Sequence, residues 1–240
     1  MNAVGVVAAL AAEARALGPA VRRTGNLNYL RNGNLVAVSG VGAAAAEASA
    51  AKLIEAGASA LMSFGLAGGL DPALPAGGLV FPSEVISRDG ASFSTAMDWR
   101  ERLSAAVMGL GPVCAGALLT SARAIDSVAE KAAVFRDTGA VAVDMESLAI
   151  AQVAAAHRLP FVAVRVIVDT AVDELPRAVV TASSSGQVRI WRLLGAIALA
   201  PAELGALIRL AGRYRIATRR LAAVARAALP PCLDARVRAA

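Results

Sequence analysis

Residues 141–174, VAVDMESLAIAQVAAAHRLPFVAVRVIVDTAVDE, decide the fold class. The stretch begins with a short apolar strand, Val141 to Val143, and continues with a helix-period segment, Ser147 to His157. A continuous apolar strand follows from Phe161 to Ile167. A strand, a helix and a second strand in this order predict a βαβ unit with parallel strands.

Two acidic residues follow these strands. Glu146 comes after the first strand and Asp169 after the second. Because ligands of such sheets bind beyond the carboxyl ends of the strands, we expect both carboxylates at one crevice. Partial burial there would raise the pKa of a carboxyl toward that of a useful proton donor. The same positions also suit acids that cap helices or lie in solvated loops, since Asp and Glu stabilise first helical turns.

Strands and helices alternate through the rest of the first 175 residues. The predicted strands are Ala3–Leu10, Leu35–Ser39, Ala60–Phe64, Gly78–Val85 and Ala115–Leu119, and the predicted helices are Ala43–Ala56 and Ala124–Thr138. Alternation without internal repeats predicts one three-layer αβα domain around a central mixed, mostly parallel sheet. We place this domain at residues 1–185, with residues 186–240 as a basic amphipathic helical extension packed on it.

Composition narrows the class of protein. At 240 residues and 57% hydrophobic, the chain is long enough to bury a large core. The two cysteines, Cys114 and Cys232, lie far apart in no metal-ligand spacing, which favours a reducing cytoplasm and no bound metal. No segment has about 18 uninterrupted strongly apolar residues, so we expect no membrane-spanning helix.

Basic charge is concentrated at the C-terminal end. Residues 1–175 carry 13 basic and 16 acidic side chains, whereas residues 176–240 carry 11 arginines and 2 acids. A helix is predicted from Pro201 toward Leu229. Its arginines fit either a solvated face of a packed last helix or an interfacial helix attracted to anionic lipid at the inner membrane face. The near absence of lysine and the few aromatic residues argue against nucleic-acid binding.

Two glycine-rich turns follow predicted strands. Ser39-Gly40-Val41-Gly42 opens a helix, so the backbone N–H groups of Ser39 and Gly40 are candidates to face an anion. Residues 65–69, GLAGG, would let a flat ligand or a phosphate approach the backbone closely. Each turn also fits an ordinary strand–helix connection. The first turn lacks the third glycine and the later acid of a dinucleotide site, so a nicotinamide cofactor is not expected.

Five blocks of the sequence resemble the nucleoside phosphorylase and nucleosidase family, which cleaves the N-glycosidic bond of purine nucleosides. The blocks are Glu13, SGVG at 39–42, FGLAGGLDPALPAGGLV at 64–80, VDMESLAIA at 143–151 and FVAVRVIVDTAVDE at 161–174. Within that family the chain is similar to phosphorylases of hopanoid biosynthesis, which remove adenine from adenosylhopane. It is similar, more distantly, to hydrolases of methylthioadenosine and S-adenosylhomocysteine. The resemblance implies a nucleoside phosphorylase-like αβα fold.

The resemblance also implies roles for individual residues. Protonated Asp169 would donate a proton to adenine N7, which makes adenine a better leaving group. Glu146 would hold the ribose hydroxyls and stabilise an oxocarbenium-like sugar, and Glu13 would orient the nucleophile. Arg165 would tie down neighbouring acids, with Asp144 and Asp173 as candidates, or serve as a purely structural ion pair. Met145 is placed against the sugar, and Ala67, Gly68 and Ile125 line the base and sugar pocket.

The sequence does not decide between water and phosphate as the nucleophile. In the phosphate-using branch of the family an arginine shortly before the glycine block grips phosphate, whereas this chain has Ser63 near that position. We expect phosphorolytic release of adenine from adenosylhopane, without a tightly bound cofactor and with phosphate as possible co-substrate. The alternatives are a soluble methylthioadenosine/S-adenosylhomocysteine nucleosidase that uses water, and a non-catalytic nucleoside- or lipid-binding protein. A homodimer is the expected assembly.

Overall fold

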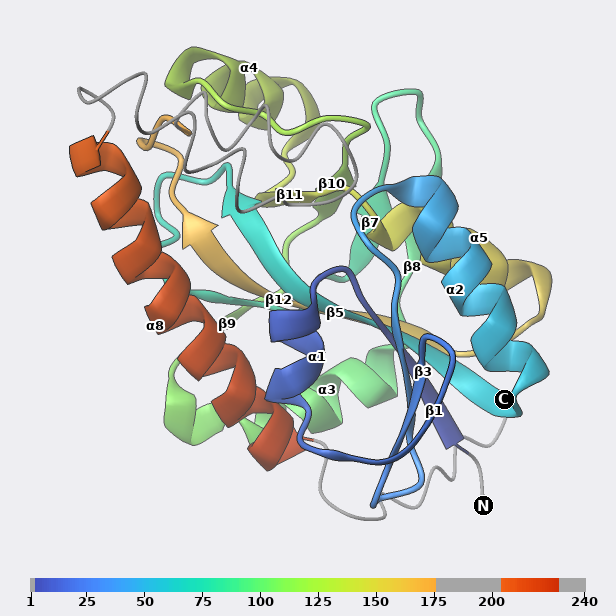
Figure 1. Cartoon of the computed structure of the whole chain (residues 1–240). Helices are drawn as coiled ribbons and strands as arrows, with labels where there is room; N and C mark the ends of the chain where they lie inside the picture. Colours follow the sequence, from blue (N-terminus) through green and yellow to red (C-terminus); the bar gives the residue numbers. More distant parts are fainter. Residues whose placement is uncertain (1–2, 176–203, 229–240) are drawn as a thin grey trace.

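The computed structural model describes residues 3–175 and 204–228 (Figure 1). The predicted domain boundary at residue 185 lies outside these ranges. The strands are β1 (Ala3–Ala8), β2 (Ala20–Thr24), β3 (Leu27–Leu30), β4 (Leu35–Val38), β5 (Ala58–Gly69), β6 (Leu79–Val80), β7 (Glu84–Ile86), β8 (Ser92–Ser94), β9 (Val113–Cys114), β10 (Leu118–Thr120), β11 (Ala142–Asp144) and β12 (Phe161–Asp169). The helices are α1 (Ala11–Ala16), α2 (Ala43–Glu55), α3 (Met97–Ala106), α4 (Val128–Thr138), α5 (Ser147–Ala156) and α8 (Leu204–Ala228), with a short 3-10 turn at Met108–Leu110.

The described strands form one mixed sheet built around β5. This strand pairs in parallel with β1 on one side and with β12 on the other, while β4 continues the parallel arrangement beyond β1. A β2–β3 hairpin closes one edge in antiparallel fashion. Helices cover both faces, so the predicted three-layer α/β fold with a mixed central sheet is confirmed.

The predicted parallel βαβ unit is wrong. The strands on either side of α5 do not pair with each other, because β5 lies between them. β12 runs parallel to β5, whereas β11 runs antiparallel to it through Val143 opposite Gly68 and Ala142 opposite Gly69. Apolar periodicity identifies both strands but carries no information about their neighbours, which long-range pairing decides.

Alternating side chains of the central strands fill two separate cores. Val7 faces the core that α2 and α5 cover, while its neighbour Val6 faces the core that α3 and α8 cover. On β5, Leu61 likewise faces the first of these cores and Met62 the second. Figure 1 shows α2 and α5 together on one side of the sheet and α1, α3 and α8 on the other. The sheet is therefore buried on both faces, which explains its continuous apolar strands.

Helix α8 packs lengthwise along β12 and α1 (Figure 1). One stripe of the helix is buried in the core: Ala217, Leu221, Val224, Ala225 and Ala228. Ile208 and Ile216 lie on the opposite, exposed side. The basic C-terminal helix thus contributes core residues to the α/β domain. Among the described helices, none is long and apolar enough to cross a membrane.

Candidate active site

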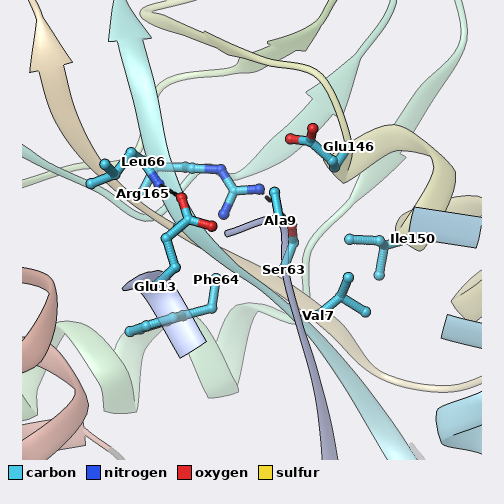
Figure 2. A pocket seen from close by; sticks show the side chains of 10 residues that line it. Val7, Ala9, Glu13, Ser63, Phe64, Leu66, Glu146, Ile150 and Arg165 are labelled. Carbon is cyan, nitrogen blue, oxygen red and sulfur yellow. Dashed lines mark hydrogen bonds between the residues drawn. The ribbon is translucent and has the colours of Figure 1, made fainter. Parts of the chain in front are cut away.

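The chemically reactive residues gather where the parallel strands end. Strands β1, β4, β5 and β12 share one direction, so their carboxyl ends meet at the same edge of the sheet. Glu13 follows β1, residues 39–42 follow β4, and Asp169 is the last residue of β12. A small pocket opens at this edge (Figure 2). Its lining includes Glu13, Ser63, Leu66, Glu146 and Arg165.

Glu13 is held in the pocket by backbone amides from two elements. Its carboxylate accepts a hydrogen bond from the Leu10 N–H at the start of α1, at 2.9 Å. The other oxygen accepts one from the Leu66 N–H of β5, also at 2.9 Å. Burial raises the pKa of Glu13, while these two amides and the Arg165 charge oppose that rise. The two amides fix the carboxyl group in place and favour its ionised form, whereas burial favours its protonated form.

Gly65 makes room for that carboxylate. A Cβ at this position would lie 2.6 Å from Glu13 Oε1 and 2.9 Å from its Cδ. Because the carboxylate is tied by two amides, we expect Gly65→Ala to push it out of both hydrogen bonds. The free energy of unfolding should fall by about 1–3 kcal/mol, as measured by urea denaturation.

A double-mutant cycle tests this explanation. In a Glu13→Ala background the clash is gone, so Gly65→Ala should cost much less than in the wild type. Gly212 is the matched control, because it lies in α8 and a Cβ added there would have no neighbouring atom within 4 Å. Gly212→Ala should stabilise the protein slightly through helix propensity. Equal effects of Gly65→Ala in both backgrounds would contradict the proposed crowding.

Glu146 enters the same pocket from the start of α5 (Figure 2). Its Oε1 accepts a hydrogen bond from the Gly42 N–H at 2.8 Å, and Oε2 accepts one from the Met145 N–H at 3.3 Å. Burial, with the negative charge of Asp144, raises the pKa of Glu146 to about 7. The Gly42 amide and Arg165 oppose this rise. A carboxyl that titrates near neutral pH is typical of functional sites.

The raised pKa makes the stability of the fold depend on pH. Between the ordinary value of 4.5 and about 7, the folded state binds more protons at Glu146 than the unfolded state does. The free energy of unfolding therefore falls as pH rises through this window. Glu146→Gln removes that dependence, so urea denaturation at pH 8 should find the variant about 1–3 kcal/mol more stable than wild type. At pH 4.5 the difference should vanish; a constant difference at both pH values would contradict the assignment.

Arg165 lines the same pocket and is drawn between the two glutamates in Figure 2. Its side chain is 3% exposed, and the guanidinium donates to Asp144 Oδ2 from both Nε and Nη2, at 3.1 and 2.7 Å. Nη2 also donates to the Ser63 and Ser147 hydroxyls, at 2.5 and 2.8 Å. Of the two predicted partners, Asp144 is therefore the correct one. Asp173 is wrong, because its carboxylate binds Thr170 and Arg213 instead.

Asp169 lies beside Gly68 at the end of β12. The two residues are register partners, and a Cβ on Gly68 would lie 3.2 Å from Asp169 Oδ2. The carboxylate is buried and pairs with the ammonium group of Lys131 at 2.5 Å. Burial raises the pKa of Asp169, and the Lys131 charge opposes that rise. Asp169 is not part of the Glu13 pocket lining; Gly68 is three residues beyond Gly65, roughly 10 Å along β5.

The remaining residues predicted to bind substrate lie in the glycine turn, in an apolar cluster and on β5. The amides of Ser39 and Gly40 donate to the carbonyls of Ala8 and Ala9, at 3.0 and 3.1 Å. These two amides are thus engaged by β1 and the residue that follows it. The Gly42 amide binds the Glu146 carboxylate, so none of these three amides is a free donor. Ile125 is buried in a third apolar cluster with Val143. Ala67 is buried on β5, and Met145 is half-buried next to Glu146.

Sequence reasoning missed Lys131, which lies on α4 and has no exposed surface. A signal was present in the composition, because Lys52 and Lys131 are the only lysines among 24 basic residues. In a chain that uses arginine almost everywhere, a lysine within an otherwise apolar helix face is distinctive. Among the described residues, no group of three or more His, Cys, Asp or Glu side chains is arranged to hold a metal ion.

Comparison with known families identifies the superfamily of the chain. Residues 5–190 match the model of the family described as "Phosphorylase superfamily". The chain belongs to the phosphorylase superfamily. That match spans β1 to β12 and therefore includes Glu13, Glu146 and Asp169. No curated protein matches the sequence.

Solved structures share the fold of this superfamily member. The 5'-methylthioadenosine/S-adenosylhomocysteine nucleosidase of Neisseria meningitidis is 24% identical, with a TM-score of 0.65 over 80% of this chain and 98% of that one. The corresponding enzyme of Helicobacter pylori is 16% identical, with a TM-score of 0.66 over 82% and 98%. The futalosine hydrolase of Helicobacter pylori is 16% identical, with a TM-score of 0.65 over 81% and 98%. The chain is an enzyme of the nucleoside phosphorylase and nucleosidase type.

Proposed function

We propose that this enzyme cleaves the N-glycosidic bond of an adenosine-type nucleoside and releases adenine. The observation that carries the proposal is the convergence of Glu13 and Glu146 on one pocket that Arg165 also lines. In this proposal a nucleoside holds its sugar between the two glutamates and extends its base along β5 toward Gly68 and Asp169.

The chemistry follows from the charges that develop as the C1'–N9 bond breaks. The bond electrons pass to the base, and the sugar becomes positively charged at C1'. Glu146 accepts hydrogen bonds from the ribose hydroxyls, and its negative charge stabilises the oxocarbenium-like sugar. Asp169 delivers a proton to adenine N7, so the base leaves neutral. A nucleophile oriented by Glu13 adds to C1'.

Water is the nucleophile that we favour in this proposal. A phosphate dianion would have to enter a pocket that two glutamates line, and like charges at short range repel. The one arginine of that lining is bound to Asp144, Ser63 and Ser147. Water fits better, because it can donate its proton to the Glu13 carboxylate as it attacks. Phosphorolysis is the alternative, and phosphate is then a co-substrate.

The substituent on the 5' carbon decides between two substrate classes. Adenosylhopane is the substrate suggested by sequence resemblance. Methylthioadenosine and S-adenosylhomocysteine are the alternative, which the fold likeness to nucleosidases of that name favours. Adenine release from each nucleoside by the purified full chain, with and without phosphate, tests the proposal. Release without phosphate supports hydrolysis, strict dependence on phosphate supports phosphorolysis, and no release from any of them overturns the proposed function.

A lipid-bearing substrate would bring the enzyme to a membrane surface, and the exposed side of α8 suits that contact. Ile208 and Ile216 are exposed there, together with Arg209, Arg215 and Arg219. An apolar and basic face is attracted to anionic headgroups. Changing the three arginines to Gln should weaken sedimentation with anionic liposomes about a hundredfold. The matched control changes three exposed arginines elsewhere, Arg23, Arg31 and Arg136, and should alter binding far less.

The arginine-to-glutamine changes keep the core intact, because the buried stripe of α8 is untouched. Equal losses in the two triple variants would show a general charge effect. No binding by the wild-type chain would remove the membrane contact from the proposal while leaving the glycosidic chemistry unaffected.

A further inference from the structure

Lys131 is a buried charged residue outside the predicted chemistry. It projects from α4 and has no exposed surface. Its ammonium group donates to Asp169 Oδ2 at 2.5 Å and to the carbonyl oxygens of Thr170 and Asp173, both at 2.9 Å. Three acceptors thus match the three N–H donors of a protonated lysine. The contacts of Lys131 are therefore those of an ammonium group held by one carboxylate and two carbonyls.

The contact with Lys131 bears on the proposed role of Asp169 as proton donor. An ionised Asp169 has no proton to give to a leaving base. The nearest available proton is the one that Lys131 donates into their shared hydrogen bond. Arg213 of α8 also acts electrostatically on Asp169, but it is paired with Asp173. Lys131 is therefore the charged group in direct contact with Asp169.

We propose that Lys131 is a positioning residue that holds Asp169 and supplies the proton which Asp169 passes to the leaving adenine. The inference rests on the proposed function. As the C1'–N9 bond breaks, adenine takes the bond electrons and N7 becomes more basic. Asp169 receives a proton from the Lys131 ammonium group, which becomes a neutral amine, and passes a proton on to N7. The attacking water loses its proton to Glu13, so charges balance, and solvent later restores Lys131 and Glu13.

The surroundings of Lys131 favour such a transfer. A buried ion pair has lost most of the hydration that stabilises separated charges, so its charged and neutral forms lie closer in energy than in water. The two carbonyl contacts hold the amine in place after it has lost its proton. Arginine could not replace lysine in this role, because a guanidinium keeps its proton in proteins.

Two substrates with different leaving groups distinguish a role of Lys131 in proton supply from a purely structural role. Adenine needs protonation to leave, whereas 4-nitrophenolate leaves as a stable anion. We expect Lys131→Met at pH 8 to lower adenine release from the accepted adenosine-type substrate about 10²-fold or more. Cleavage of 4-nitrophenyl β-D-riboside should fall less than about tenfold, because Glu13 and Glu146 still act on the sugar. Both rates come from the same sample, so their ratio is independent of how much of the variant is folded.

Three further variants sharpen the comparison. Lys131→Arg keeps a positive charge but does not release a proton, so it should show the same selective loss of adenine release. Lys52→Met changes the only other lysine, which is exposed on α2, and should leave both rates unchanged. Asp169→Asn should reproduce the substrate ratio of Lys131→Met.

A pH profile gives a second readout that needs only adenine release. Without the Lys131 charge the pKa of Asp169 rises further, because burial is then opposed by less positive charge. At low pH the variant Asp169 would carry its own proton. The defect of Lys131→Met should therefore shrink from about 10²-fold at pH 8 to less than about tenfold at pH 5.5.

The outcomes are distinct. Parallel losses on both substrates with a defect that does not change with pH would assign Lys131 a structural role and overturn the inference alone. Unchanged adenine release in Lys131→Met would do the same. A wild-type enzyme that releases adenine from no nucleoside would overturn the proposed function and the inference with it.

Discussion

Replacing Asp169 with Asn is expected to lower kcat for adenine release about 10²- to 10⁴-fold, while the substrate still binds. Asparagine has nearly the same shape, but its side-chain amide does not transfer a proton to adenine N7. Gly68 leaves space beside residue 169, so the change introduces no new contact with β5. Steady-state release of adenine at several pH values measures the effect.

Two controls keep this result interpretable. Asp169→Asn leaves the buried Lys131 ammonium without its counter-ion, and breaking such a pair costs about 3–5 kcal/mol of stability. Titrating the active fraction with a tight-binding substrate analogue corrects for that loss. Asp137→Asn, an exposed change on α4, should leave kcat unchanged. Adenine release by Asp169→Asn at the wild-type rate would contradict the role of Asp169.

Replacing Arg165 with Met is expected to destabilise the fold by about 3–5 kcal/mol. The change removes the cation from a pair whose side chains are only 3% and 1% exposed. Asp144 would keep the hydrogen bonds from Thr120 and Ser147 but would become an uncompensated buried charge. Urea denaturation at pH 7.5 measures the effect.

An exposed arginine pair provides the matched control. Arg123 binds Glu130 at 2.6 Å, with its side chain 66% exposed. Arg123→Met should cost less than about 1 kcal/mol, because water screens and replaces that interaction. In the double variant Arg165→Met/Asp144→Leu neither charge remains, so its loss should be smaller than the sum of the two single losses. Equal losses for Arg165→Met and Arg123→Met would contradict the structural importance of burial.

Local sequence signals explain much of the fold. Runs such as Phe161 to Ile167 are apolar except at Arg165 because both faces of the strand are buried, and such runs identify central strands. The β2–β3 hairpin went unpredicted, since its strands are short and carry the exposed polar residues of an edge. Strand β5 is longer than the predicted Ala60–Phe64, because the glycine-rich segment continues the ladder to Gly69.

The sequence by itself determined that acids would stand at strand ends and that the chain would form a layered α/β domain. The layered fold was predictable because burial sets the spacing of apolar residues along strands and helices. The place of the acids was predictable because the carboxyl ends of parallel strands lie at one edge of the sheet. Only the tertiary structure decided the direction of β11 and the partners of Arg165, Asp169 and Ser39. Those contacts join residues far apart in the chain, such as Lys131 and Asp169. The local sequence around a buried charge does not indicate which distant group will pair with it.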